Sequence, residues 1–307
     1  MKIAIIGRSE ILYDTAILLR EAGHDIALVV TSKEAPEYTK TAKDFEALAA
    51  QAGCPFVKTA KIEDIFPVLD KIGNIDIAVS VNYAGIIPQN VIDRFSLGIL
   101  NAHGGDLPRY RGNACQAWAI LNGEDKIGLC IHRMIGGELD SGDIIARDYY
   151  PLTLDTTITA VWTWINSRVP GLFAQAVEAL ATDPAYVLEV QSKDPNDALR
   201  CYPRRPEDGR IDWQRSALEI LRLINASNKP YAGAFCMLEG QKFIVWTAQL
   251  SEDTERYLAV PGQVTAVTES YIDVATGNGK LRISLAELNG ETAPPKAFIT
   301  SIRTRLE

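Results

Sequence analysis

Three side chains that together could catalyse acyl transfer lie close in the sequence: the amide of Asn101, the imidazole of His103 and the carboxylate of Asp140. An amide and an imidazole can stabilise a developing oxyanion, and a carboxylate can orient or relay a proton, so no covalent intermediate is needed. The apolar run 97–100 leads directly into Asn101. If that run is a strand, Asn101 and His103 point to the same side, because side chains two apart share a face, and Asp140 must arrive from a separate loop.

The residues around this trio form a longer pattern: Asn-Ala-His-Gly at 101–104, Leu-Pro-Arg-Tyr-Arg-Gly at 107–112 and Leu-Asp-Ser-Gly-Asp at 139–143. In this order and spacing the pattern resembles the formyltransferases that use N10-formyltetrahydrofolate. Two later segments, 208–213 and 228–235, are similar to the second-domain signature of that family, and 240–246 resembles its arabinosamine branch. The resemblance therefore covers nearly the whole chain.

The resemblance implies that Asn101, His103 and Asp140 are the catalytic residues. A neutral primary amine would attack the formyl carbon of N10-formyltetrahydrofolate, the co-substrate, while Asn101 and His103 stabilise the tetrahedral oxyanion. Two further segments look like the parts of the family that line the folate pocket. They imply these folate-contacting residues: Gly85, Ile86, Ile87, Ile135, Gly136, Leu139 and Asp143.

Several polar residues are candidates for substrate contacts, and most have a simpler interpretation as well. Arg8 and Ser9 follow the first expected strand, where they could hold a phosphate at a helix N-terminus or form a plain helix start with a capping serine. The chain has Gly-Asp-Leu-Pro at 105–108 where the family often reads Ser-Leu-Leu-Pro, and Asp106 is either a substrate contact or a solvated turn residue. The remaining candidates are Asn82, Tyr83, Arg111 and Tyr231, of which Arg111 could instead brace its loop and Tyr231 could simply pack.

Other residues with reactive groups are interpreted as structural. His132 alternates with apolar neighbours as a strand residue does, and we expect it to have a structural role. The five cysteines are scattered and contain no C-x-x-C pair, which favours buried free thiols over disulfides or a zinc site. Because the chain has only three histidines, we expect no metal site.

Short apolar runs alternate with helical patterns through the first half of the chain. This alternation predicts βαβ units and an α/β fold with a Rossmann-like, doubly wound parallel sheet. The expected strands are 3–6, 25–30, 75–81, 97–103, 128–134 and 143–150, and the expected helices are 11–22, 44–52, 62–71, 115–121 and 156–181. After Gly7 the chain lacks the second and third glycines of the dinucleotide fingerprint, so a nicotinamide cofactor is not expected.

Turn-rich stretches at 194–197 and 202–209 divide the chain into two expected domains, a catalytic domain at 1–200 and a smaller one at 201–307. The second has one helical pattern, 216–226, and several strand-like runs. Few helices and many short strands predict a mostly β, OB-like or open-barrel domain.

The distribution of charge bears on the identity of the amine. The formal net charge is −8, and residues 200–307 hold 14 Lys and Arg against 13 Asp and Glu, which leaves −9 on residues 1–199. A surface that binds nucleic acid needs clustered positive charge, so no nucleic-acid partner is expected. The segment 202–206 also looks more like the enzymes that formylate nucleotide-linked amino-deoxysugars for surface polysaccharide or lipid A. Such a sugar is the favoured acceptor, and methionyl-tRNA is the alternative.

Two other classes stay open. One is a sensor of folate or nucleotide sugar without chemistry, although the intact catalytic trio argues against it. The other is a folate hydrolase in which water replaces the amine. The first apolar run, 3–6, is too short for a signal sequence or a membrane span, so we expect a cytoplasmic protein without a membrane partner. The sequence leaves open the nucleotide, the sugar, the position of its amine and the formation of a homodimer.

Overall fold

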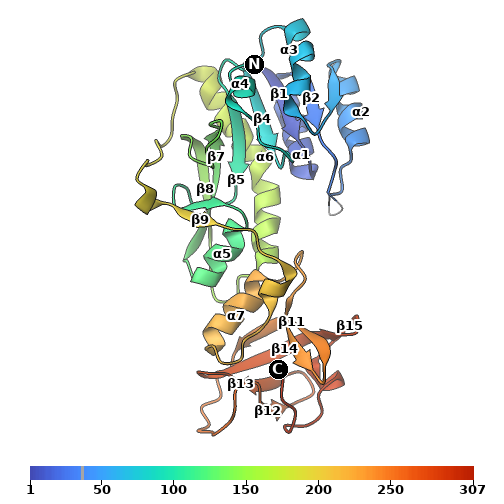
Figure 1. Cartoon of the computed structure of the whole chain (residues 1–307), viewed down its shortest axis with the longest axis vertical. Helices are drawn as coiled ribbons and strands as arrows, with labels where there is room; N and C mark the ends of the chain where they lie inside the picture. The colour runs from blue at the N-terminus through green and yellow to red at the C-terminus, as the bar shows by residue number, and fades with distance from the viewer. Residues whose placement is uncertain (36–37) are drawn as a thin grey trace. The chain divides into compact units, whose positions relative to one another are not determined.

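The structure is a computed structural model that describes residues 1–35 and 38–307 and divides into two compact units (Figure 1). The first unit contains Met1–Gly112, Gly128–Tyr150 and Thr163–Arg200, and the second contains Asn113–Ile127, Pro151–Trp162 and Cys201–Glu307. The domain boundary between residues 200 and 201 stays a prediction. The structure adds that two short segments from before residue 200 group with the second unit.

A seven-stranded sheet with the order β3-β2-β1-β4-β5-β7-β8 forms the centre of the first unit. Its strands are β1 (Lys2–Gly7), β2 (Asp25–Thr31), β3 (Phe56–Lys58), β4 (Ile77–Val81), β5 (Ile99–His103), β7 (Lys126–Arg133) and β8 (Ile144–Pro151). The pairs from β3 to β5 are all parallel. Every residue of β4 is buried, as expected for a parallel strand covered on both faces. The predicted α/β, Rossmann-like fold is confirmed.

Amphipathic helices connect these strands (Figure 1). They are α1 (Glu10–Glu21), α2 (Ala42–Ala52), α3 (Phe66–Ile72), α4 (Gln89–Ile92), α5 (Cys115–Asn122) and α6 (Ile158–Thr182), with a short 3₁₀ turn at Ile62–Ile65. Helix α1 buries Ile11, Leu12 and Leu19, which recur at helical spacing. Helix α2 starts with a capping box between Thr41 and Asp44, as its sequence chemistry favours.

The sheet departs from a fully parallel arrangement at one edge. Strand β7 runs antiparallel to β5, and its register places His132 opposite Asn101 and Cys130 opposite His103. The link from β5 to β7 is therefore not the right-handed crossover that a βαβ unit would use. Because residues directly opposite each other in an antiparallel pair share a face, β7 brings a second histidine beside Asn101.

The second unit contains an antiparallel sheet with the order β10-β11-β14-β13-β12, in which β15 also pairs with β14. The elements are α7 (Ala217–Ala226), β10 (Ala234–Leu238), β11 (Gln241–Leu250), β12 (Val264–Val267), β13 (Ile272–Ala275), β14 (Lys280–Leu288) and β15 (Glu291–Ala293). Short 3₁₀ turns lie at Pro195–Asp197, Pro206–Gly209 and Pro295–Ala297, and β6 (Tyr110–Gly112) pairs with β9 (Leu199–Cys201) in a separate two-stranded sheet. A smaller, mostly β domain was predicted, and this prediction is confirmed.

The last residues of the chain bridge the two edges of the antiparallel sheet. Glu307 and Met237, on β10, exchange backbone hydrogen bonds of 3.0 and 2.7 Å, and Val264, on β12, donates one of 3.1 Å to Thr304. The edge strands are thus joined by a terminal segment. This is how a small open barrel protects exposed strand edges.

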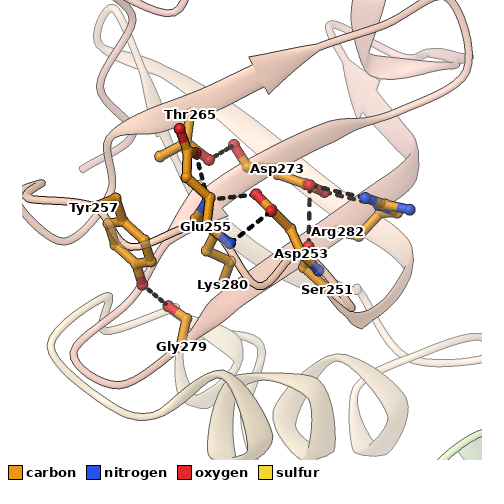
Figure 2. Close-up of polar contacts among 9 residues, drawn as sticks. All are labelled: Ser251, Asp253, Glu255, Tyr257, Thr265, Asp273, Gly279, Lys280 and Arg282. Atoms are coloured by element: carbon orange, nitrogen blue, oxygen red, sulfur yellow. Dashed lines mark hydrogen bonds and ion pairs between the residues drawn. The ribbon is translucent and has the colours of Figure 1, made fainter.

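A cluster of ion pairs fastens the irregular segment after β11 to this sheet (Figure 2). Lys280, on β14, is only 5% exposed, and its Nζ lies 2.6 Å from Asp253 and 3.3 Å from Glu255. On the neighbouring strand β13, the buried Asp273 accepts two hydrogen bonds from Arg282, of 2.8 and 2.9 Å. A buried cation is stable when carboxylates compensate it, so the pairs of Lys280 hold the segment on the sheet, and Asp273 adds a hydrogen bond of 3.0 Å from Ser251.

Candidate active site

One face of the β5–β7 pair carries an amide and two imidazoles. The Nδ2 atom of Asn101 lies 3.3 Å from Nε2 of His132, and the ring centres of His103 and His132 are 6.3 Å apart. Asn101 and His103 lie two residues apart on β5, and His132 comes from the register of β7. The expectation that Asn101 and His103 share a face therefore agrees with the strand geometry.

His103 is almost completely buried, and both of its ring nitrogens face oxygen atoms. Nε2 lies 2.7 Å from the carbonyl oxygen of Tyr110, and Nδ1 lies 3.5 Å from Oδ2 of Asp140. A carbonyl oxygen only accepts, so Nε2 carries the proton and Nδ1 holds a lone pair. Burial lowers the pKa of His103, partly opposed by the negative charge of Asp140, so the imidazole is neutral near neutral pH.

Gly105 makes the contact between His103 and Tyr110 possible. A Cβ atom at position 105 would lie 2.4 Å from Nε2 of His103 and 2.5 Å from the carbonyl oxygen of Tyr110. Both distances are shorter than any tolerable contact. A glycine at position 105 is therefore required by packing.

Asp140 reaches the histidines from the loop between β7 and β8. Its Oδ2 accepts a hydrogen bond of 2.9 Å from the backbone N–H of Gly112, and its Oδ1 lies 3.6 Å from Nε2 of His132. Burial by itself raises the pKa of Asp140, but the facing imidazoles and the Gly112 N–H outweigh it and hold that pKa well below its usual range. The carboxylate is therefore ionised and supplies the negative charge of the cluster.

The loop that carries Asp140 is held by a buried glutamine. The Nε2 atom of Gln191 donates hydrogen bonds to the carbonyl oxygens of Asp140 (2.9 Å) and Gly142 (2.6 Å). Its Oε1 accepts one of 3.0 Å from Arg111. Arg111, a candidate substrate contact, is thus engaged in fixing the loop. Sequence reasoning missed Gln191 because no motif surrounds it and its partners lie 49 to 80 positions away.

A cavity of about 290 Å³ opens beside the cluster, lined by Asn101, His132 and Asp140 among others. Five of the expected folate-contacting residues line it: Gly85, Ile86, Ile87, Ile135 and Leu139. The other two are not among its lining residues: Gly136 donates its N–H to Gln89, and Asp143 accepts a hydrogen bond from the backbone N–H of Gln191. His103 does not line the cavity either, because it lies behind Asp140 and Asn101 in the buried layer.

Four candidate substrate contacts, Arg8, Ser9, Asn82 and Tyr83, follow the carboxyl ends of β1 and β4. The guanidinium of Arg8 donates hydrogen bonds to the carbonyl oxygens of Asn82 (2.8 Å) and Lys33 (2.6 Å). Ser9 is buried at the start of α1 with a φ of 92°, and within the described residues its hydroxyl has no hydrogen-bond partner. Tyr83 donates a hydrogen bond of 3.3 Å to the carbonyl oxygen of Thr59. Arg8 is thus used, at least in part, to join backbone segments.

The last two candidate substrate contacts have different surroundings. Asp106 accepts a hydrogen bond of 2.5 Å from Arg147, which also donates to Glu189 at 2.9 Å and to the carbonyl oxygen of Leu107 at 2.7 Å. The sequence suggested a substrate contact or a solvated turn residue at position 106. The ion pair with Arg147 indicates a third role: Asp106 braces the loop that follows His103. Tyr231 belongs to the second unit, where it lines a separate small cavity of about 80 Å³.

Within residues 1–35 and 38–307, no group of three or more His, Cys, Asp and Glu side chains is arranged to hold a metal ion. No helix in the described part of the chain is long and apolar enough to cross a membrane.

Comparison with known proteins places these features in a family. Residues 1–177 match the family described as formyl transferase, and residues 204–303 match its C-terminal domain. The chain is 29% identical over 296 residues to the methionyl-tRNA formyltransferase of Agathobacter rectalis, which covers 95% of this chain and 93% of the relative.

Solved structures share the fold at lower identity. The N-formyltransferase of Helicobacter canadensis, in complex with folinic acid and dTDP-3-aminofucose, has a TM-score of 0.68 at 17% identity and covers 92% of this chain and 98% of its own. HypX of Aquifex aeolicus, in complex with tetrahydrofolic acid, has a TM-score of 0.62 at 19% identity and covers 98% of this chain. This chain spans about half the length of HypX, 47% of it. From the match over its N-terminal half and most of its C-terminal unit, the chain belongs to the formyl transferase family.

Proposed function

We propose that this chain transfers a formyl group from N10-formyltetrahydrofolate to the primary amine of a nucleotide-linked amino-deoxysugar. The observation that carries the proposal is the position of Asn101 and Asp140, which line one cavity and contact the two buried histidines. An amide donor, a neutral imidazole and an ionised carboxylate are the groups that direct transfer of an acyl unit needs.

The cavity suits a flat, partly aromatic folate. Three large apolar side chains at its lining are exposed: Ile86 at 84%, Ile135 at 40% and Leu139 at 37%. Exposed apolar groups beside a cavity are stabilised when a ring system covers them. Gly85 and Gly137 leave backbone groups accessible for hydrogen bonds in the same lining. Bound there, N10-formyltetrahydrofolate would supply an activated formyl group.

Asn101 is the donor for the oxyanion. In the transfer, the C–N bond to the acceptor amine forms, the C–N10 bond breaks, the amine loses a proton and N10 gains one. Negative charge develops on the formyl oxygen between these steps, and the amide N–H of Asn101 would stabilise it. Losing one such donor costs about 100- to 1000-fold in rate.

His103 and Asp140 would accept the proton that the amine loses and return it to N10. The lone pair on Nδ1 of His103 lies on the side of Asp140, at 3.5 Å from Oδ2. A proton taken up at Nδ1 is stabilised by the ionised carboxylate, whose own pKa is held low. Because His103 does not line the cavity, the same proton would return to N10 through a water, so that the pair begins and ends each cycle in one state.

The charge of the chain favours a small anionic acceptor over a transfer RNA. With a net charge of −8 and +1 on residues 200–307, the chain lacks the positive excess that binding many phosphates requires. Among the described residues, the buried hydroxyl of Ser9 has no hydrogen-bond partner, and together with the neighbouring Arg8 it offers two groups for a phosphate at the start of α1. The second candidate is methionyl-tRNA formylation, favoured by the name of the relative from A. rectalis.

A formyl-transfer assay tests the proposal. The purified protein and N10-formyltetrahydrofolate are incubated with nucleotide-linked 3-amino and 4-amino sugars that differ in nucleotide, and separately with initiator methionyl-tRNA. Mass spectrometry detects an acceptor that gains one CO unit. The matched controls are Asn101→Ala, which removes the proposed donor, and Asn196→Ala, which changes an asparagine in the turn before β9.

A formylated sugar that disappears with Asn101→Ala but not with Asn196→Ala supports the proposal and identifies the substrate. If methionyl-tRNA is formylated and no sugar product forms, the sugar proposal is wrong and the second candidate, methionyl-tRNA formylation, takes its place. Formate released without an acceptor product indicates hydrolysis, and folate binding without any turnover indicates a sensor. The cytoplasmic location and the absence of a nucleic-acid partner are part of the same proposal. Equilibrium sedimentation would show whether the chain forms a homodimer.

A further inference from the structure

His132 lines the cavity, while His103, the histidine marked by the sequence pattern, does not. Its position follows from the register that pairs it with Asn101 across β5 and β7. It is only 2% exposed, so its ring is held in one place by the packing around it. A buried imidazole in contact with a proposed oxyanion donor can control how that donor is oriented.

The protonation of His132 follows from its partners. Its Nδ1 lies 2.9 Å from the carbonyl oxygen of Arg133, which can only accept. In the tautomer that donates from Nδ1 to this carbonyl oxygen, Nε2 has a lone pair. The atom of Asn101 that faces Nε2, at 3.3 Å, must then be the amide nitrogen, because the amide oxygen would place two lone pairs against each other.

An amide nitrogen carries two N–H groups, and His132 uses one of them. The second is directed away from Nε2 and is the one that can meet a formyl oxygen in the cavity that both residues line. If the amide turned by half a rotation, its oxygen would replace the N–H and repel the developing oxyanion. Oδ1 of Asp140 also faces Nε2, but at 3.6 Å it lies beyond hydrogen-bond distance, so the amide of Asn101 at 3.3 Å is the nearer partner of that nitrogen.

We propose that His132 is a positioning residue for formyl transfer: through Nε2 it holds the side-chain amide of Asn101 with an N–H toward the formyl oxygen. This inference rests on the formyl transfer proposed above. His132 acts through Asn101, so it needs no contact with the donor or the acceptor.

Two variants separate this role from a merely structural one. In His132→Gln, the Oε1 atom can replace Nε2 as acceptor, whereas His132→Leu keeps the volume and loses the acceptor. We expect His132→Leu to lower kcat by about 10- to 100-fold, less than the 100- to 1000-fold loss of a removed donor, because the amide is misoriented rather than absent. The dissociation constant for tetrahydrofolate should stay within about twofold, and His132→Gln should recover most of kcat.

A double-mutant cycle tests the route through Asn101. If His132 acts only on that amide, His132→Leu should change the residual rate of Asn101→Ala by less than about threefold. Multiplied effects of the two substitutions would overturn the proposal. Equal loss in His132→Gln and His132→Leu, with unfolding temperatures lowered alike, would overturn it too, since a packing role predicts that result.

A spectroscopic measurement is independent of any acceptor, and so of the proposed function. The side-chain amide signal of Asn101 in an ¹H–¹⁵N spectrum is identified by its loss in Asn101→Ala. In the proposed arrangement one amide proton is hydrogen-bonded, and its signal should move upfield in His132→Leu and stay in place in His132→Gln. An unchanged signal in His132→Leu would contradict the proposal even if transfer activity had been found. A shift without any transfer activity would support the contact and leave the proposed function as the part that failed.

Discussion

The Nδ1 atom of His103 and the Oδ2 atom of Asp140 lie 3.5 Å apart, although one residue ends strand β5 and the other lies in the loop between β7 and β8. Burial keeps His103 neutral, while its contacts keep Asp140 ionised. The pair therefore combines a proton acceptor with a fixed negative charge. This relationship can be tested by titration without knowledge of the acceptor.

Substituting Asp140→Asn should lower the pKa of His103 further. Burial is the largest effect on that pKa and lowers it, and the negative charge of Asp140 is the larger of the two effects that raise it. In the variant only the hydrogen bond with the Tyr110 carbonyl still raises the pKa of His103, while burial and His132 lower it. An NMR titration of the His103 ring signals measures the change, with Asp93→Asn at the exposed end of α4 as the control. A His103 pKa that rises or stays constant in Asp140→Asn would contradict the assigned geometry.

The stability of the wild-type protein should fall in acid because burial lowers the pKa of His103. The pKa of His103 is lower in the folded chain than in the unfolded chain, so the unfolded chain binds more protons below about pH 6.5. The free energy of unfolding that burial of neutral His103 contributes is present above that pH, and it is lost as the pH falls toward the folded-state pKa. Urea unfolding of wild type and His103→Gln at several pH values measures this. The slope between about pH 6.5 and 5 should be smaller in the variant.

Gly105→Ala should displace His103, for which a role in proton transfer is proposed. The added Cβ would lie 2.4 Å from Nε2 of His103, so either the ring or the backbone at Tyr110 must move and the hydrogen bond between them is lost. Transfer activity should fall by at least about tenfold, because small displacements of a catalytic group cost that much. Gly171→Ala is the control: apart from the helix's own backbone, the one atom of the described residues that its Cβ would approach belongs to the flexible side chain of Arg168, at 3.3 Å. Equal activity in the two variants would show that His103 tolerates the displacement.

Much of this site could be anticipated from local pattern, and the rest depends on pairing between distant segments. The apolar run before Asn101 predicted a strand, and the period of two along it placed Asn101 and His103 on one face. The position of His132 opposite Asn101 depends on the antiparallel register of β7, which the alternation along a single strand does not encode. Gln191 supports the Asp140 loop from a segment without a motif, so its role appears only in three dimensions.

Asp106→Asn should affect stability more than substrate binding. Asp106 pairs with the mostly buried Arg147, so its loss leaves that guanidinium with fewer carboxylate contacts and costs about 1–2 kcal/mol of the free energy of unfolding. The KM for the acceptor should remain within about twofold, since the carboxylate is engaged with Arg147. Denaturant unfolding and steady-state kinetics measure the two effects. A large rise in KM with unchanged stability would restore the interpretation of Asp106 as a substrate contact.

Lys280→Met should release the segment after β11 from the sheet of the second unit. Met keeps most of the volume of Lys280 but leaves Asp253 and Glu255 without their shared cation, which lies 2.6 and 3.3 Å from them (Figure 2). Hydrogen bonds to a charged group contribute about 1.5–3 kcal/mol, and both carboxylates are partly exposed, so we expect a loss near the lower end of that range. Hydrogen exchange should accelerate in residues 251–261 and stay unchanged in the β10–β11 hairpin. The control is Lys296→Met. Lys296 lies 3.9 Å from Glu269, whose side chain is 92% exposed, so this ion pair should contribute less than about 1 kcal/mol. If both variants lost equal stability, or if exchange rose equally across the sheet, the Lys280 cluster would not be what holds this segment.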